Sequence, residues 1–149
     1  MTTRPATRAD IPTIVSFNIG IAAETEDHQL DPDIVTPGVT RFFDDSAYGF
    51  YTVAESESGD VIGCLLITYE WSDWRNGLFW WIQSVYVWPQ HRRSGCYRRL
   101  YAAVKEEARA AGAAGLRLYV DSRNERAQAT YAALGMDGEH YRVFEFLFD

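Results

Sequence analysis

Cysteine and histidine are scarce in this chain of 149 residues, which contains two cysteines and three histidines. Cys64 lies in an apolar run and Cys96 follows a glycine, so the pair is not the disulfide framework of a small secreted protein. The histidines are scattered, without the spacing of metal ligands. The sequence therefore predicts neither a disulfide-stabilised fold nor a metal site.

Long hydrophobic runs are also missing, and no stretch approaches the ~20 apolar residues of a membrane-spanning helix. Residues 1–5 are not followed by the hydrophobic segment of a secretory signal, so we expect a cytoplasmic protein. Basic residues are fewer than acidic ones, 14 against 21, which gives a net charge of −7. This balance argues against nucleic acids and anionic membranes as partners and mildly favours a cationic substrate.

Apolar and aromatic side chains, in contrast, are abundant. Hydrophobic residues make up 47% of the chain and aromatic residues 15%. The length fits one domain, residues 1–149, that can bury a core without covalent cross-links. We expect a large buried sheet, and an apolar surface through which a homodimer could form.

Hydrophobic periodicity predicts the elements of this domain. Helices are expected at 11–23, 39–45, 97–108 and 127–134, and strands at 2–8, 50–55, 61–69, 80–88, 115–120 and 141–148. The prolines of residues 31–38 indicate a loop. The order β-α-α-β-β-β-α-β-α-β predicts an α/β fold with a mixed central sheet flanked by helices.

The segment from Trp80 to Ala111 combines an apolar strand, a turn around Gly95 and an amphipathic helix. The first turn of a helix has unpaired backbone N–H groups and the positive end of the helix dipole, and Gly95 lets a ligand approach the backbone closely. Four arginines surround the turn: Arg92, Arg93, Arg98 and Arg99. The pattern indicates a phosphate site, and the competing interpretation is a solvated basic helix start.

Two motifs resemble those of a known family. Arg92-x-x-Gly95 after the strand resembles the acyl-CoA motif of the GNAT superfamily of N-acetyltransferases, Gln/Arg-x-x-Gly-x-Gly/Ala, with Tyr97 at the last position. The block Asn-x-x-Ala-x-x-x-Tyr-x-x-x-Gly, from Asn124 to Gly135, resembles the family's segment after that helix. The order of elements is also that of the GNAT family, so the resemblance covers nearly the whole chain.

The resemblance implies an acetyltransferase that uses acetyl-CoA as co-substrate and needs no metal. The implied cofactor-binding residues are Val85, Tyr86, Val87, Arg92, Arg93, Ser94, Gly95, Cys96, Tyr97, Arg98 and Asn124. In the family the turn binds the pyrophosphate of coenzyme A, and a backbone N–H of the central strand stabilises the oxyanion. Tyr131 matches the phenol that protonates the departing thiolate; without the motif it would be read as a packing aromatic.

Within the family, the chain is loosely most similar to the diamine and polyamine acetyltransferases, although Gln83 stands where those enzymes carry glutamate. An alkylammonium group, with a pKa near ~10.4, must lose a proton before it attacks, and Gln83 cannot accept it. The candidate bases are Glu24, Glu26, Glu70 and Asp73, acting directly or through water. The acceptor is expected to be a small cationic amine, held where two acidic and aromatic clusters converge, with the contacts Glu24, Glu26, Trp71, Trp74 and Gln83.

Other interpretations remain open at this stage. Tyr97 and Gln83 depart from the family pattern and favour a catalytically silent acyl-CoA-binding regulatory module. A protein or peptide N-acetyltransferase would use the same chemistry. A nucleotide-binding domain of another fold is disfavoured, because the chain has neither G-x-G-x-x-G nor Gly-Lys-Ser/Thr. The loop acids could also be solvated surface residues, with the tryptophans packed on the sheet or on a partner subunit.

Overall fold

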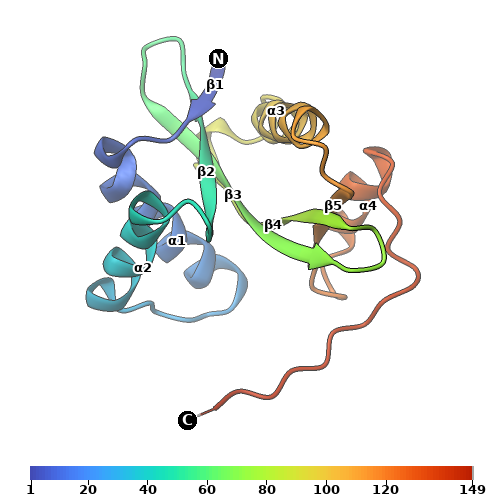
Figure 1. The fold of residues 1–149 in the computed structure, drawn as a ribbon. Coiled ribbons are helices and arrows are strands. Elements are labelled where there is room, and N and C mark those ends of the chain that lie inside the picture. Colours follow the sequence, from blue (N-terminus) through green and yellow to red (C-terminus); the bar gives the residue numbers. More distant parts are fainter. Residues whose placement is uncertain (149) are drawn as a thin grey trace. The chain divides into compact units, whose positions relative to one another are not determined.

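The computed structural model describes residues 1–148, which divide into two compact units, Met1–Leu118 and the segment from Tyr119 onward (Figure 1). The first unit contains a five-stranded sheet and the helices α1, α2 and α3. The second contains the helix α4. Within residues 1–148 no helix is both long enough and apolar enough to cross a bilayer.

The sheet is mixed, as the sequence predicts. Its strands are β1 (Thr2–Pro5), β2 (Gly49–Glu55), β3 (Val61–Ser72), β4 (Gly77–Val87) and β5 (Gly115–Leu118). They lie in the order β1-β2-β3-β4-β5, and neighbours are antiparallel except β4 and β5, which are parallel. A parallel pair needs a crossover connection, which α3 (Cys96–Ala110) supplies. The predicted α/β fold class is confirmed.

The helices of the first unit cover both faces of the sheet. α1 (Ile11–Thr25) and α2 (Pro32–Asp44) lie on one face, and α3 lies on the other (Figure 1). Because side chains alternate along a strand, each face presents its own apolar set. The set that packs with α1 and α2 includes Tyr51, Val53, Cys64, Leu66 and Tyr86. On the opposite face α3 buries Leu100 and Val104 completely.

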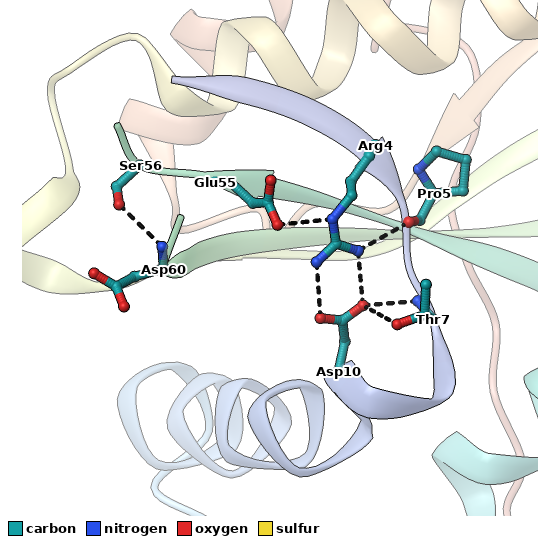
Figure 2. A network of polar contacts seen from close by, with 7 residues as sticks. All are labelled: Arg4, Pro5, Thr7, Asp10, Glu55, Ser56 and Asp60. Carbon is teal, nitrogen blue, oxygen red and sulfur yellow. Dashed lines mark hydrogen bonds and ion pairs between the residues drawn. The ribbon is translucent and has the colours of Figure 1, made fainter. Parts of the chain in front are cut away.

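An ionic network ties β1 to the start of α1, just after a short 3-10 turn at Arg8–Asp10 (Figure 2). The Arg4 guanidinium donates to both carboxylate oxygens of Asp10, at 2.8 and 3.0 Å, and to Glu55 of β2 at 2.7 Å. Asp10 Oδ2 also accepts from the backbone N–H of Thr7 at 2.7 Å. Asp10 is only 6% exposed, and these bonds, above all those from Arg4, lower its pKa to about 2. A buried carboxylate is thus fully paired.

The helix α2 begins earlier than the sequence predicts. Asp31 caps it, because its Oδ1 accepts from the backbone N–H of Asp33 at 2.9 Å, and Pro32 occupies the first helical position, where proline is favoured. Pro37 lies inside the helix. The predicted loop at 31–38 was therefore wrong, because the start signal of Asp31 and Pro32 outweighed the single proline inside the helix.

Residues 141–148 form no strand, although their alternating pattern predicts one. A β-strand is defined by ladder hydrogen bonds to a neighbouring strand, and this segment makes none in the described part of the chain. Its large side chains are exposed, with Phe144 at 94%. The sixth strand was a wrong prediction, because alternation indicates what a segment can pair with but supplies no partner.

Candidate functional site

Half of strand β4 has an edge without a partner strand. β5 pairs only with the stretch from Phe79 to Ile82, opposite Gly115 to Leu118, whereas β4 continues to Val87. No strand of residues 1–148 pairs with the remainder on that side. A strand edge of this kind presents backbone N–H and C=O groups that can bind a ligand.

Strand β4 has a β-bulge at Gln83, directly after Ile82, the last residue of β4 that pairs with β5. Leu66 of β3 lies opposite Ser84 and Ile67 lies opposite Ile82, so Gln83 is left without an opposite residue. Bulges bend a strand and are frequent next to functional sites. The side chain of Gln83 is exposed, at the beginning of the open edge.

The hydrogen bonds of β4 show which backbone groups face this edge. The N–H of Trp88 donates to Ile62 on β3 at 3.0 Å, and successive residues of a strand point to opposite sides. The backbone N–H and C=O groups of Val85 and Val87 therefore point away from β3, whereas those of Tyr86 point toward it. The Val87 carbonyl agrees with this, because it accepts from Arg92 Nε at 2.9 Å. Of the three strand residues predicted to bind the cofactor, two present a backbone N–H to the open edge.

The turn after β4 leads into an uncapped helix. A short 3-10 turn, Pro89–His91, comes first, and Arg93 and Gly95 then adopt φ values of +65° and +83°. No side chain caps α3, whose first intrahelical bond runs from Arg99 N–H to Gly95 O at 3.1 Å. The N–H groups of residues 96–98 precede that bond, in the first turn of the helix.

Space and charge at this turn both suit an anion. A Cβ built at Gly95 would meet no atom within 4 Å, so the backbone there is open. The first turn of α3 has no acidic residue, and Arg93, Arg98 and Arg99 are exposed around it. Ser94 Oγ donates to the carbonyl of His91 at 2.6 Å, which stabilises the turn. The start of α3 can therefore bind a phosphate group through its backbone.

Cys96 and Tyr97 use their side chains for packing. Cys96 is 2% exposed, and burial raises the pKa of its thiol, which does not suit a reactive thiolate. The Tyr97 ring centroid lies 6.3 Å from that of Tyr101, one helical turn further along α3. Both residues contribute backbone N–H groups at the helix start.

Glu24, predicted to contact the acceptor, is bonded to the end of β4 and to the turn that follows it. Its Oε1 accepts from the Tyr86 hydroxyl at 2.6 Å, and its Oε2 accepts from Arg92 Nη2 at 2.7 Å. These bonds, the one from Tyr86 foremost, lower the pKa of Glu24. The pKa of Tyr86 is raised, mainly by burial and further by Glu24. A signal in the sequence pointed this way, because an acid at a helix C-terminus needs a partner against the dipole.

Trp71 and Trp74, also predicted to contact the acceptor, lie at the other end of β4, in the β3–β4 hairpin. Trp71 is opposite Leu78 in the β3–β4 register, whereas Glu24 is bonded to Tyr86, about 25 Å further along the strand at ~3.3 Å per residue. Glu26 follows the end of α1 with an exposed side chain. Glu24 is therefore separated from the hairpin, and the convergence of the other acidic and aromatic residues on one pocket stays a prediction.

Two of the candidate bases, Glu70 and Asp73, belong to the β3–β4 hairpin. Glu70 forms an ion pair with Arg117 of β5, whose guanidinium lies 3.7 Å from the Phe79 ring centroid. Asp73 accepts from the backbone N–H of Trp74 at 2.9 Å in the turn between the strands. The indoles beside them are exposed, Trp71 at 61% and Trp74 at 92%. This end of the hairpin thus combines carboxylates with accessible aromatic faces.

The second unit holds the remaining predicted residues. α4 (Glu125–Ala133) begins where Asn124 Oδ1 accepts from the backbone N–H of Ala127 at 3.0 Å, so Asn124 serves as its N-cap. Tyr131 lies half-buried in the last turn of this helix, and Gly135, with φ of +84°, follows its end. In the described residues, no three His, Cys, Asp or Glu side chains are grouped as metal ligands.

Comparisons with known proteins agree with this geometry. The chain is similar to the thialysine N-epsilon-acetyltransferase of Bos taurus, with 31% identity over 96 residues, which cover 62% of this chain and 56% of that protein. The matched region is thus little more than half the length of this curated relative. A possible acetyltransferase from Clostridium difficile 630 has a similar structure, with a TM-score of 0.91, 40% identity, and coverage of 99% of this chain and 97% of that one.

A more distant structure shares the fold alone. It is an aminoglycoside antibiotic 6'-N-acetyltransferase from Acinetobacter haemolyticus, with a TM-score of 0.77 and 18% identity over the full length of both chains. The model of the acetyltransferase (GNAT) family matches residues 19–136, most of this chain and both of its units. The chain therefore belongs to the acetyltransferase (GNAT) family.

Proposed function

We propose that this protein transfers an acetyl group from acetyl-CoA to the primary amine of a small cationic acceptor. The observation that carries the proposal is that the uncapped start of α3 closely follows the open edge of β4 in the chain. The helix start offers the backbone N–H groups of its first turn, and the strand edge offers those of Val85 and Val87. The proposal treats residues 1–149 as one catalytic domain. The family match supports this, since it continues across the boundary at Leu118.

The residues at the turn fit the donor. The N–H groups of residues 96–98 and the surrounding arginines would hold the pyrophosphate, and the open space at Gly95 lets it approach. The N–H groups of Val85 and Val87 would bind the pantetheine arm and the thioester carbonyl. Acetyl-CoA supplies an activated acetyl group, and the chain supplies preorganised donors for the negative charge that develops on its oxygen.

Two proton transfers complete the proposed reaction. The ammonium group of the acceptor must give up a proton before its nitrogen attacks. We assign its removal to Asp73 or Glu70, acting directly or through water, because Gln83 cannot accept a proton. Tyr131 is the proposed acid that protonates the departing thiolate, and this assignment rests on its position in the Asn124-to-Gly135 block.

The acceptor would be recognised at the end of the β3–β4 hairpin. Exposed indole faces at Trp71 and Trp74 attract ammonium groups by ~0.5–2 kcal/mol each, and Asp73 adds a carboxylate. Gln83 at the bulge and Glu26 after α1 remain proposed contacts. The name of the Bos taurus relative, thialysine N-epsilon-acetyltransferase, supports an amine acceptor.

Calorimetry and a turnover assay test the donor and the acceptor separately. We expect the protein to bind acetyl-CoA and to acetylate members of a panel of diamines, polyamines, amino sugars and lysine-like amino acids. Binding without turnover on any amine would indicate a silent acyl-CoA-binding module, and turnover on peptides alone would indicate a peptide N-acetyltransferase. Failure to bind acetyl-CoA would refute the proposal altogether.

A further inference from the structure

The last turn of α1 is attached to the turn that precedes α3. Glu24 lies near the C-terminus of α1, where a negative charge opposes the helix dipole. Both of its carboxylate oxygens are nevertheless bonded, one to the Tyr86 hydroxyl at 2.6 Å and one to Arg92 Nη2 at 2.7 Å. Because the position is unfavourable for the helix and both oxygens are bonded, we take the role of the carboxylate to be to hold Tyr86 and Arg92, not to stabilise α1.

Arg92 is fixed from three sides. Its Nε donates to the Val87 carbonyl at 2.9 Å, its Nη2 donates to Glu24, and its guanidinium carbon lies 5.2 Å from the Tyr86 ring centroid. A guanidinium group is planar and carries five N–H donors. The contacts of the described residues use two of them. Fixing two nitrogens of a rigid fork also fixes the direction of the other three N–H groups.

We propose that Glu24 is a positioning residue, which holds Arg92 in place for the pyrophosphate of coenzyme A. This inference rests on the proposed function. A free arginine side chain would lose its rotamer freedom when the phosphate binds, and that loss corresponds to roughly 2- to 12-fold in affinity. In this protein folding has already ordered the side chain.

Charge repulsion alone predicts the opposite effect of Glu24 on the affinity for coenzyme A. A carboxylate near a bound pyrophosphate repels it, so removing the charge of Glu24 should by itself tighten binding. The Arg92 and Glu24 side chains are 40% and 41% exposed, so solvent screens this repulsion. If positioning outweighs repulsion, neutralising Glu24 weakens binding; if repulsion dominates, neutralising it strengthens binding.

Gly20 provides a second way to disturb the same contact without changing any charge. It precedes Glu24 by one helical turn, and a Cβ placed on it would lie 2.8 Å from the Tyr86 hydroxyl oxygen. The absence of a side chain at Gly20 thus lets the Tyr86 ring lie against α1, where its hydroxyl reaches Glu24. Gly20→Ala should push the hydroxyl away and weaken the hold on Glu24.

Calorimetric titration with coenzyme A tests the proposal in the full chain. We expect Glu24→Gln to raise the Kd about 3- to 10-fold and Gly20→Ala to raise it by a smaller factor. Asp27→Asn is the matched control, because it removes the same charge from an exposed residue three positions further on, and it should leave the Kd for coenzyme A unchanged. In an Arg92→Ala background, Glu24→Gln should have no effect, since Glu24 acts through Arg92.

The outcomes separate this inference from the proposed function. An unchanged or lower Kd in Glu24→Gln overturns the positioning role while wild-type binding still supports the acetyl-CoA site. A wild-type protein that does not bind coenzyme A overturns both. Steady-state kinetics adds a readout that general destabilisation would not give, since the KM for acetyl-CoA should rise while kcat at saturating donor stays near wild type.

Discussion

Asp10 offers a prediction whose size follows from the structure. Its carboxylate is paired with Arg4 and bonded to Thr7, and its pKa is lowered from 3.8 to about 2. A lowered folded-state pKa means that the ionised carboxylate stabilises the fold above pH 3.8 and that this contribution is lost as the pH falls toward 2. At 1.36 kcal/mol per pKa unit, the shift corresponds to about 2 kcal/mol at neutral pH.

Urea unfolding of the wild type and of Asp10→Asn measures this contribution. At pH 7 we expect the variant to unfold with a free energy about 2 kcal/mol lower, because asparagine keeps the shape but loses the charge. Between about pH 5 and pH 2 the wild type should lose this advantage, so that the two curves approach each other.

Asp44→Asn is the matched control for this experiment. Asp44 forms an ion pair with Arg8, with both side chains more than half exposed, so its loss should cost under about 1 kcal/mol. A difference between wild type and Asp10→Asn that is small at pH 7, or that does not shrink on acidification, would show that the Arg4 network does not stabilise the fold through its charge.

Three further predictions concern the proposed reaction. Gly95→Val should abolish acetyl-CoA binding, because it places a β-branched residue at φ of +83° and fills the open space, and unchanged affinity in calorimetry would move the site elsewhere. Tyr131→Phe should lower kcat by ~10²–10⁴-fold with little change in acetyl-CoA affinity, and an unaltered kcat where acetyl transfer limits turnover would exclude Tyr131 as the acid. Asp73→Asn and Glu26→Gln should each raise the KM for the amine and leave that for acetyl-CoA nearly constant; wild-type kinetics in both would contradict the acceptor assignment.

The structure of the turn proposed to bind the donor could be predicted from sequence, because local rules decide it. A strand, a glycine at a helix start and flanking arginines indicate an anion site wherever they occur together, and the structure has each of these features at the turn around Gly95. The sequence alone does not show which backbone N–H groups of β4 face the open edge. Which of Val85, Tyr86 and Val87 faces the open edge depends on the pairing with β3 and on the bulge at Gln83.

Long-range contacts explain the remaining differences. The sequence shows that Glu24 sits unfavourably at the end of a helix, but Tyr86 and Arg92, which bind it, are more than 60 residues away. The strand predicted at 141–148 was wrong for the same reason, because a strand also depends on a distant partner and the alternation of apolar residues does not supply one. The earlier start of α2 is different, since the Asp31 cap is visible in the sequence and outweighs the helix-breaking tendency of Pro37.

The reassignment of Glu24 also changes what the acidic composition implies. The net charge of −7 and the acids after α1 both favoured a cationic acceptor when the sequence was considered alone. One of those acids, Glu24, has its oxygens bonded to Tyr86 and Arg92, and Tyr86 lies about 25 Å along β4 from the residue opposite Trp71. The case for a cationic acceptor therefore rests on Asp73 and the exposed indoles of the β3–β4 hairpin, and substitutions there are the ones that should change the choice of amine.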